Sequence, residues 1–173
     1  GVAESRHLVD VANTKDARVD IDEEDKLGQM MARFRYHTDY GSIEAILMPY
    51  FRENEFLGKN SRLTLPFNIN DAQYESSKNK KHLDFAVRYS HSFSDYDLGI
   101  HYFHGTSRDA LLIPDLSGGL TPYYQVVDQV GIDLQATYDA LLLKFEGIYR
   151  KGQGGAIIGA LEDEYFASVF GFE

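Results

Sequence analysis

The chain has 173 residues, about one domain's worth, with a formal net charge of −10 at pH 7, 12 Tyr, 11 Phe and neither Cys nor Trp. The acidic balance argues against nucleic-acid binding, because phosphate recognition needs a surplus of Lys and Arg. The lack of Cys excludes disulfides, thiolate zinc sites and cysteine nucleophiles, and these residues contain no run of 18 apolar side chains of the kind that forms a transmembrane helix.

The first strong strand signal covers residues 27–38, where apolar and polar side chains alternate. The apolar set is Met30, Ala32, Phe34 and Tyr36, and the opposite set is Gln29, Arg33, Arg35 and His37. A turn at 39–41 leads into a second alternating run at 42–51. The two runs predict a β-hairpin.

The same pattern returns twice further along the chain. Residues 83–93 and 98–102 flank a turn at 94–97, and residues 124–137 and 141–150 flank a turn at 138–139. In both pairs the apolar side chains fall on one face and the polar side chains on the other. Weaker runs at 6–12 and 164–173 bring the strand candidates to eight, and no segment has a convincing helical period.

Short and long connections alternate between these candidates. The long ones cover residues 13–26, 52–82, 105–122 and 151–163, and we expect them to be exposed loops. Tight turns at one end and long loops at the other are typical of outer-membrane barrels. A soluble β-barrel that binds a ligand also shows alternating strands, so it remains the alternative.

Strand length and aromatic placement favour the membrane. The runs are 10 to 15 residues long, whereas a strand needs about 9–11 residues to cross a bilayer and globular strands average about 5–6. Tyrosine and phenylalanine gather near the strand ends, where a ring can lie in the apolar layer with its hydroxyl among headgroups. The aromatic residues in question are Tyr36, Tyr40, Tyr50, Phe51, Phe93, Tyr96, Tyr123, Tyr124, Tyr138, Tyr149 and Tyr165.

The sequence therefore predicts an all-β fold, an antiparallel up-and-down transmembrane β-barrel with about eight strands in this chain. We expect residues 1–173 to form a single barrel domain or part of one, located in the bacterial outer membrane. The expected partners are outer-membrane lipid and lipopolysaccharide, with other outer-membrane or periplasmic proteins as further candidates. No cofactor is expected.

Five segments resemble a porin-like family of Gram-negative outer-membrane β-barrel proteins with no assigned activity. They are GVAESRHLVD at 1–10, EDKLGQ at 24–29, PYFR at 49–52, HGTSRD at 104–109 and QVGIDLQ at 129–135. Members of that family are considerably longer, with sequence on both sides of the matching region. The resemblance implies that this chain is an internal piece of a larger barrel.

Candidate metal and catalytic groups have weaker support. The acidic run at 16–25 can gather a divalent cation but lacks the central glycine of an EF-hand, so a solvated loop is the preferred interpretation. A nucleophile and its base on one strand must share a face, yet His91 alternates with Ser90 and Ser92. His101 and His104 also fall on opposite faces. We therefore expect neither a catalytic nor a metal site.

Charged side chains in the middle of the strands are the best candidates for function, because charge inside a barrel decides which solutes enter. We expect a porin-like channel for passive or weakly selective passage of small solutes. A structural alternative is that the Arg and Lys side chains of this set pair with Glu44, Asp84, Asp133 and Glu146. The alternative functions are a non-conducting scaffold, whose loops, above all 52–82, bind a partner or surface polymer, and an outer-membrane hydrolase. The expected lumen-lining residues are Arg33, Arg35, Arg88, Lys144, Glu146 and Arg150.

Overall fold

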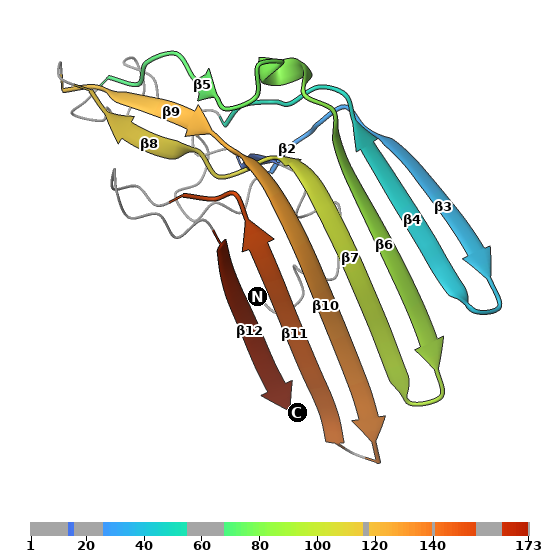
Figure 1. Cartoon of the computed structure of the whole chain (residues 1–173). Coiled ribbons are helices and arrows are strands. Elements are labelled where there is room, and N and C mark those ends of the chain that lie inside the picture. The colour runs from blue at the N-terminus through green and yellow to red at the C-terminus, as the bar shows by residue number, and fades with distance from the viewer. Residues whose placement is uncertain are drawn as a thin grey trace.

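The computed structural model describes residues 14–15, 26–54, 68–115, 118–139, 141–154 and 164–172. Apart from one 3-10 turn, η2 (Asn79–Lys81), the regular structure of these residues is β. A seven-stranded antiparallel sheet dominates (Figure 1). Its strands are β3 (Ala32–Thr38), β4 (Gly41–Met48), β6 (Asp84–Phe93), β7 (Tyr96–Thr106), β10 (Val126–Tyr138), β11 (Leu141–Lys151) and β12 (Glu164–Phe172).

The order of the strands in this sheet is β12-β11-β10-β7-β6-β4-β3, so each strand lies beside the one that follows it along the chain in this sheet. The three predicted hairpins are confirmed as β3–β4, β6–β7 and β10–β11, with antiparallel pairing throughout. β12 confirms the strand predicted at 164–173. The strand predicted at 6–12 lies outside the described residues.

A closed barrel is not found. Within the described ranges the large sheet is open, and β3 and β12 each pair with a single neighbour. Closure needs every strand to be hydrogen-bonded on both sides, with strand number, tilt and stagger matched. The predicted antiparallel β class is therefore confirmed, and the closed form is not.

The hairpin turns all lie at one end of the sheet and the long connections at the other (Figure 1). Gly41 closes the first turn with a φ of +119°. An added Cβ at Gly41 would lie 2.5 Å from the carbonyl oxygen of Ser90 on β6. Only glycine combines this backbone conformation with such a close approach to the neighbouring strand.

Three of the long connections contain strands, which corrects the prediction of plain loops at 13–26, 52–82 and 105–122. β5 (Gln73–Tyr74), β8 (Leu111–Pro114) and β9 (Leu120–Tyr124) form a small sheet in the order β5-β9-β8. It lies at the end away from the hairpin turns (Figure 1). The 13–26 connection contains part of one further antiparallel pair, β1 (Thr14–Lys15) with β2 (Lys26–Leu27).

The two faces of the large sheet are as the alternation predicts, and on its central strand the apolar side chains are the more exposed ones. On the central strand β10, Val130, Ile132 and Leu134 are 46%, 40% and 38% exposed. On the same strand Gln129 and Asp133 are only 2% and 6% exposed. Cross-strand partners share a face, so Tyr102, Ile100 and Leu98 of β7 continue the exposed apolar face.

A small apolar cluster interrupts the polar face near the long connections. It consists of Ile46, Met48, Ala86, Phe103 and Val127, all buried. Met31 packs against this cluster. Period-2 alternation puts these residues on the polar face correctly, but it does not predict that this end is packed with apolar side chains.

Some of the predicted interfacial aromatics have other roles. Phe51 and Tyr124 are fully buried and pack against each other, so they cannot lie at a membrane boundary. Tyr165 pairs with Arg150 on the polar face, and the guanidinium carbon lies 5.9 Å from the centre of its ring. By contrast, Tyr36, Tyr40, Phe93, Tyr96 and Tyr138 are exposed near the hairpin turns.

Candidate functional site

All six side chains singled out in the sequence lie on one face of the sheet. The ladder pairs Arg33 and Arg35 with Ile46 and Glu44, Arg88 with His101, and Arg150 with Gln129. On β11, Lys144 and Glu146 face Gln135 and Asp133. The structure therefore places Arg33, Arg35, Arg88, Lys144, Glu146 and Arg150 on the polar face, spread across three strands, β3, β6 and β11.

At the β3 edge, two guanidinium groups share one carboxylate. Arg33 Nη2 lies 2.8 Å and Arg35 Nη2 2.5 Å from Glu44 Oε2. The side chain of Glu44 is 11% exposed, whereas those of the two arginines are 45% and 46% exposed. Glu44 neutralises only one of the two, so this cluster keeps a net positive charge that faces solvent.

The centre of the face contains an ion pair that spans three strands. Arg88 of β6 lies 2.7 Å from Asp133 of β10. Gly99 of β7 lies between them, and a Cβ there would be 2.1 Å from Arg88 Nη2 and 2.5 Å from both carboxylate oxygens of Asp133. Because Gly99 has no side chain, the guanidinium of Arg88 can reach across β7.

A second polar cluster adjoins the ion pair. Arg150 donates to Gln129 Oε1 through Nε at 2.8 Å and through Nη2 at 2.5 Å. Gln129 Nε2 in turn lies 3.2 Å from His101 Nε2. Gly131 makes room for the imidazole, since a Cβ there would be 2.1 Å from His101 Cε1. His101 and the two glycines were not identified from the sequence as part of a site.

Three polar atoms in this region are buried without a hydrogen-bond partner among the described residues. They are Arg88 Nη1, His101 Nδ1 and Asp133 Oδ1, the last of which is in ion-pair contact with Arg88 Nη2. An unpaired buried polar group costs about 1–3 kcal/mol unless water or a solute satisfies it. This part of the face is therefore chemically suited to water or a small polar solute.

The alternative of structural pairing holds for Glu44 and Asp133, which pair with the predicted bases as described above. Asp84 instead pairs with Arg108, whose Nη1 lies 2.6 Å from Asp84 Oδ2. His82 Nδ1 lies 2.7 Å from the other carboxylate oxygen. The pairing was missed because Arg108 follows β7 in the long connection, where the alternation carries no information.

The Asp84–Arg108 pair fastens the long connections to the sheet. Asp84 is fully buried and also accepts a hydrogen bond from the backbone N–H of Thr106, at 3.0 Å. The guanidinium of Arg108 lies 5.1 Å and 5.3 Å from the ring centres of Phe51 and Phe103. Removing either partner of a buried ion pair strongly destabilises the folded state, because the remaining buried charge loses its counter-charge.

The histidine and serine positions are as the alternation predicts. Ser90 pairs with Gly99 on the polar face, and His91 pairs with Leu98 on the apolar face. His104 lies 2.9 Å from Asp128, away from His101. Within the described ranges no group of three or more His, Asp or Glu side chains is placed to hold a metal ion. The acidic run at 16–25 lies outside these ranges.

Comparison with known proteins gives no further guide to this site. No protein-family model, curated protein or solved structure matches the chain. In the part of the chain that the structure describes, no helix is both long and apolar enough to cross a membrane.

Proposed function

We propose that the chain forms part of an outer-membrane β-barrel of the porin-like class, which passes small solutes through a water-filled lumen. The observation that carries this proposal is the burial along β10, where three aliphatic side chains are exposed between buried polar ones. Exposing such a surface to water is unfavourable, and large apolar patches mark contact with a membrane or a partner. A membrane barrel turns this face to lipid and the polar face inward.

Strand length and the arrangement of the connections support the same proposal. β6, β7, β10 and β11 have 10, 11, 13 and 11 residues, against about 9–11 needed to cross a bilayer. The short turns share one end of the sheet, as periplasmic turns do in outer-membrane barrels. The exposed aromatic rings near these turns suit an interfacial belt next to lipid and lipopolysaccharide.

The free edges of β3 and β12 bear on the size of the barrel. Unpaired backbone N–H and C=O groups cannot remain exposed in hydrocarbon, so a complete barrel needs a partner strand at both edges. Because β3 and β12 are not paired with each other, the barrel we propose has more than seven strands. A barrel of eight strands is just wide enough to fill with side chains, whereas one of about 16 leaves an aqueous channel.

The polar face would then line the lumen, with the cluster of Arg33, Arg35 and Glu44 at its most exposed position. The central pair of Arg88 with Asp133 is internally neutral. Because the central pair is neutral and only the β3 cluster keeps a net charge, we expect weak rather than strict selectivity. The excess of positive charge in the β3 cluster favours anions.

Conductance in planar bilayers tests the proposal. The natural full-length protein should form channels with a mild anion preference, and Arg33→Gln combined with Arg35→Gln should shift the reversal potential toward cations. Arg52→Gln removes a positive charge outside the strands and should change the reversal potential much less. Protein that inserts but passes no current contradicts the channel and favours a scaffold whose loops bind a partner.

A further inference from the structure

Two histidines from separate parts of the chain lie close together beside the start of β6. His82 follows η2 directly, and His104 lies on β7. Their ring centres are 5.7 Å apart. His104 pairs with Phe85 on the apolar face of the sheet, whereas His82 precedes β6, so strand alternation could not bring the two together. The contact between these imidazoles is therefore a product of the tertiary fold.

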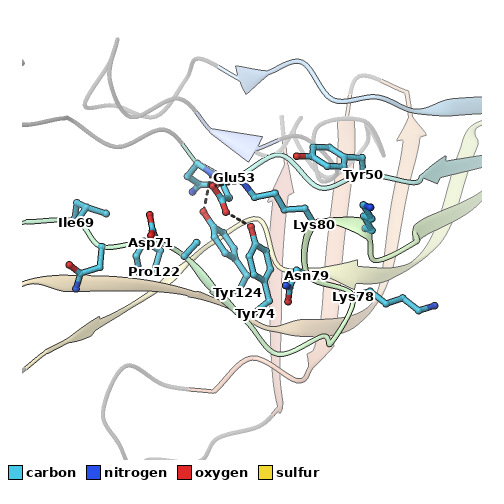
Figure 2. A pocket seen from close by; sticks show the side chains of 14 residues that line it. Tyr50, Glu53, Ile69, Asp71, Tyr74, Lys78, Asn79, Lys80, Pro122 and Tyr124 are labelled. Carbon is cyan, nitrogen blue, oxygen red and sulfur yellow. Dashed lines mark hydrogen bonds and ion pairs between the residues drawn. The ribbon is translucent and has the colours of Figure 1, made fainter.

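Backbone hydrogen bonds hold the segment that carries His82. Phe51 N donates to Lys80 O at 2.7 Å, and His82 N donates to Asn79 O at 3.1 Å. Figure 2 shows Asn79 and Lys80 of this segment among the residues that line a pocket of about 720 Å³. A side chain on a backbone that is already held in position loses little conformational entropy when it binds a ligand.

Each imidazole is oriented by a carboxylate. His82 Nδ1 lies 2.7 Å from Asp84 Oδ1, and His104 Nδ1 lies 2.9 Å from Asp128 Oδ1. An ionised carboxylate only accepts hydrogen bonds, so Nδ1 of each ring carries a proton. In the neutral imidazole the other nitrogen, Nε2, then keeps its lone pair. This is the tautomer that binds a metal ion through Nε2 while a carboxylate holds the ring.

Both Nε2 atoms are open to solvent. Neither has a hydrogen-bond partner among the described residues, and neither is one of the buried side-chain atoms that lack a partner. The side chains of His82 and His104 are 16% and 32% exposed. The two nitrogens of an imidazole point away from each other. His104, whose Nδ1 is bonded toward β10, therefore directs Nε2 toward β6, the strand that His82 precedes.

The spacing of the two rings suits a single ion. Zn²⁺ bound at about 2.0–2.1 Å to both Nε2 atoms lies about 3.2 Å from each ring centre, so a tetrahedral angle separates the centres by about 5.2 Å. The observed 5.7 Å is about 0.5 Å wider, a difference that a small rotation of either side chain closes. Within the described ranges no third His, Asp or Glu completes such a group, so water would fill the remaining positions.

We propose that His82 and His104 bind one divalent transition-metal ion of the zinc, nickel and copper class through their Nε2 atoms. The ion would join the segment before β6 to β7, with Asp84 and Asp128 orienting the ligands through Nδ1. Imidazole nitrogen suits these metals, whereas Ca²⁺ prefers oxygen ligands. The site goes beyond the proposed channel and does not depend on conduction.

Calorimetric titration of the full-length protein in detergent with zinc chloride tests the site. Zn²⁺ should bind saturably, and an excess of Ca²⁺ should not displace it, because the ligands are nitrogen atoms. Bound Cu²⁺ should show hyperfine coupling to two imidazole nitrogens in its electron paramagnetic resonance spectrum. The absence of saturable zinc binding, displacement by Ca²⁺, or coupling to fewer than two nitrogens overturns the proposal.

Variants locate the ion. Asp128→Asn changes only the group that orients His104, so it should weaken zinc binding about tenfold while copper still shows two nitrogens. His82→Gln and His104→Gln each remove a ligand. Each should weaken zinc binding more than Asp128→Asn does and leave copper coupled to one nitrogen.

His91→Gln is the matched control. His91 also lies on the apolar face, stacked on Phe93 with ring centres 5.4 Å apart, and it has no carboxylate partner within the described ranges. Its replacement should leave zinc affinity and the copper spectrum unchanged. Unchanged zinc affinity in His82→Gln or His104→Gln, or an equal loss in His91→Gln, contradicts the assignment.

Discussion

Gly99 of β7 lies directly opposite Asp133 of β10, and the guanidinium of Arg88 occupies the space that a side chain at Gly99 would need. Because Gly99 has no side chain, the charge pair can form across three strands. The same arrangement recurs at Gly131, which leaves room for the ring of His101. Both glycines lie on the polar face, in the middle of long strands.

Replacing Gly99 should therefore damage the polar face selectively. Gly99→Ala places a Cβ 2.1 Å from Arg88 Nη2 and 2.5 Å from both Asp133 carboxylate oxygens, so the side chains of this pair must shift from their positions. We expect a loss of about 1–3 kcal/mol in the free energy of unfolding, measured by urea denaturation. Gly171→Ala on β12 is the matched control, because nothing lies within 4 Å of its added Cβ. If both variants unfold at the same urea concentration, this packing argument is wrong.

Removing the buried carboxylate of Asp84 should have the largest effect. Asp84→Ala takes the Asp84 carboxylate away from the buried guanidinium of Arg108, and we expect a loss of about 3–5 kcal/mol in the free energy of unfolding. Adding Arg108→Met should recover part of this loss, because it removes the buried positive charge that Asp84 compensated. Asp39→Ala, in the exposed first turn, should stay within about 0.5 kcal/mol of the unmodified protein. A double variant no more stable than Asp84→Ala would contradict the pairing.

Tyr124 predicts a specific dependence of stability on alkaline pH. Burial raises the pKa of Tyr124 to about 12, from an ordinary value of 10.0. Between these values the folded chain keeps a proton that the unfolded chain releases, so this stabilisation is complete below pH 10 and is lost as the pH rises toward about 12. Tyr124→Phe should flatten the decline of unfolding free energy in this window.

The control for this measurement is Tyr138→Phe, which removes a tyrosine with a largely exposed ring. The unfolding free energy of Tyr138→Phe should decline as steeply as that of the unmodified protein between pH 10 and 12. Absorbance at 295 nm, where tyrosinate absorbs, follows the ionisation directly. Equal slopes in Tyr124→Phe and the unmodified protein would show that Tyr124 does not hold its proton in the fold.

The sequence was most informative where the chain alternates over long distances. A period of two specifies which side chains share a face, so the face assignments of β6 and β10 follow directly from the residue pattern. The lengths of the turns then predict which strands are neighbours. This is why the six charged residues were correctly placed on one face.

The local pattern could not predict the contacts that depend on distant segments. β8 and β9 are short and end at or contain Pro114 and Pro122, so no alternation marks them as strands. The pairing of Arg108 with Asp84 and the stacking of Tyr74 on Tyr124 join residues from separate connections. Such contacts are decided by tertiary packing, which a single sequence does not display.

The absence of cysteine from the chain permits a direct test of which face meets lipid. Leu134 and Gln135 are neighbours on β10 that point to opposite faces. A nitroxide label on Leu134→Cys, in liposomes, should collide readily with oxygen and poorly with a water-soluble nickel complex. A label on Gln135→Cys should instead collide readily with the nickel complex and poorly with oxygen. Equal access of the nickel complex to both positions, or greater access at Leu134→Cys, would contradict a lipid-facing apolar surface and a water-lined polar one.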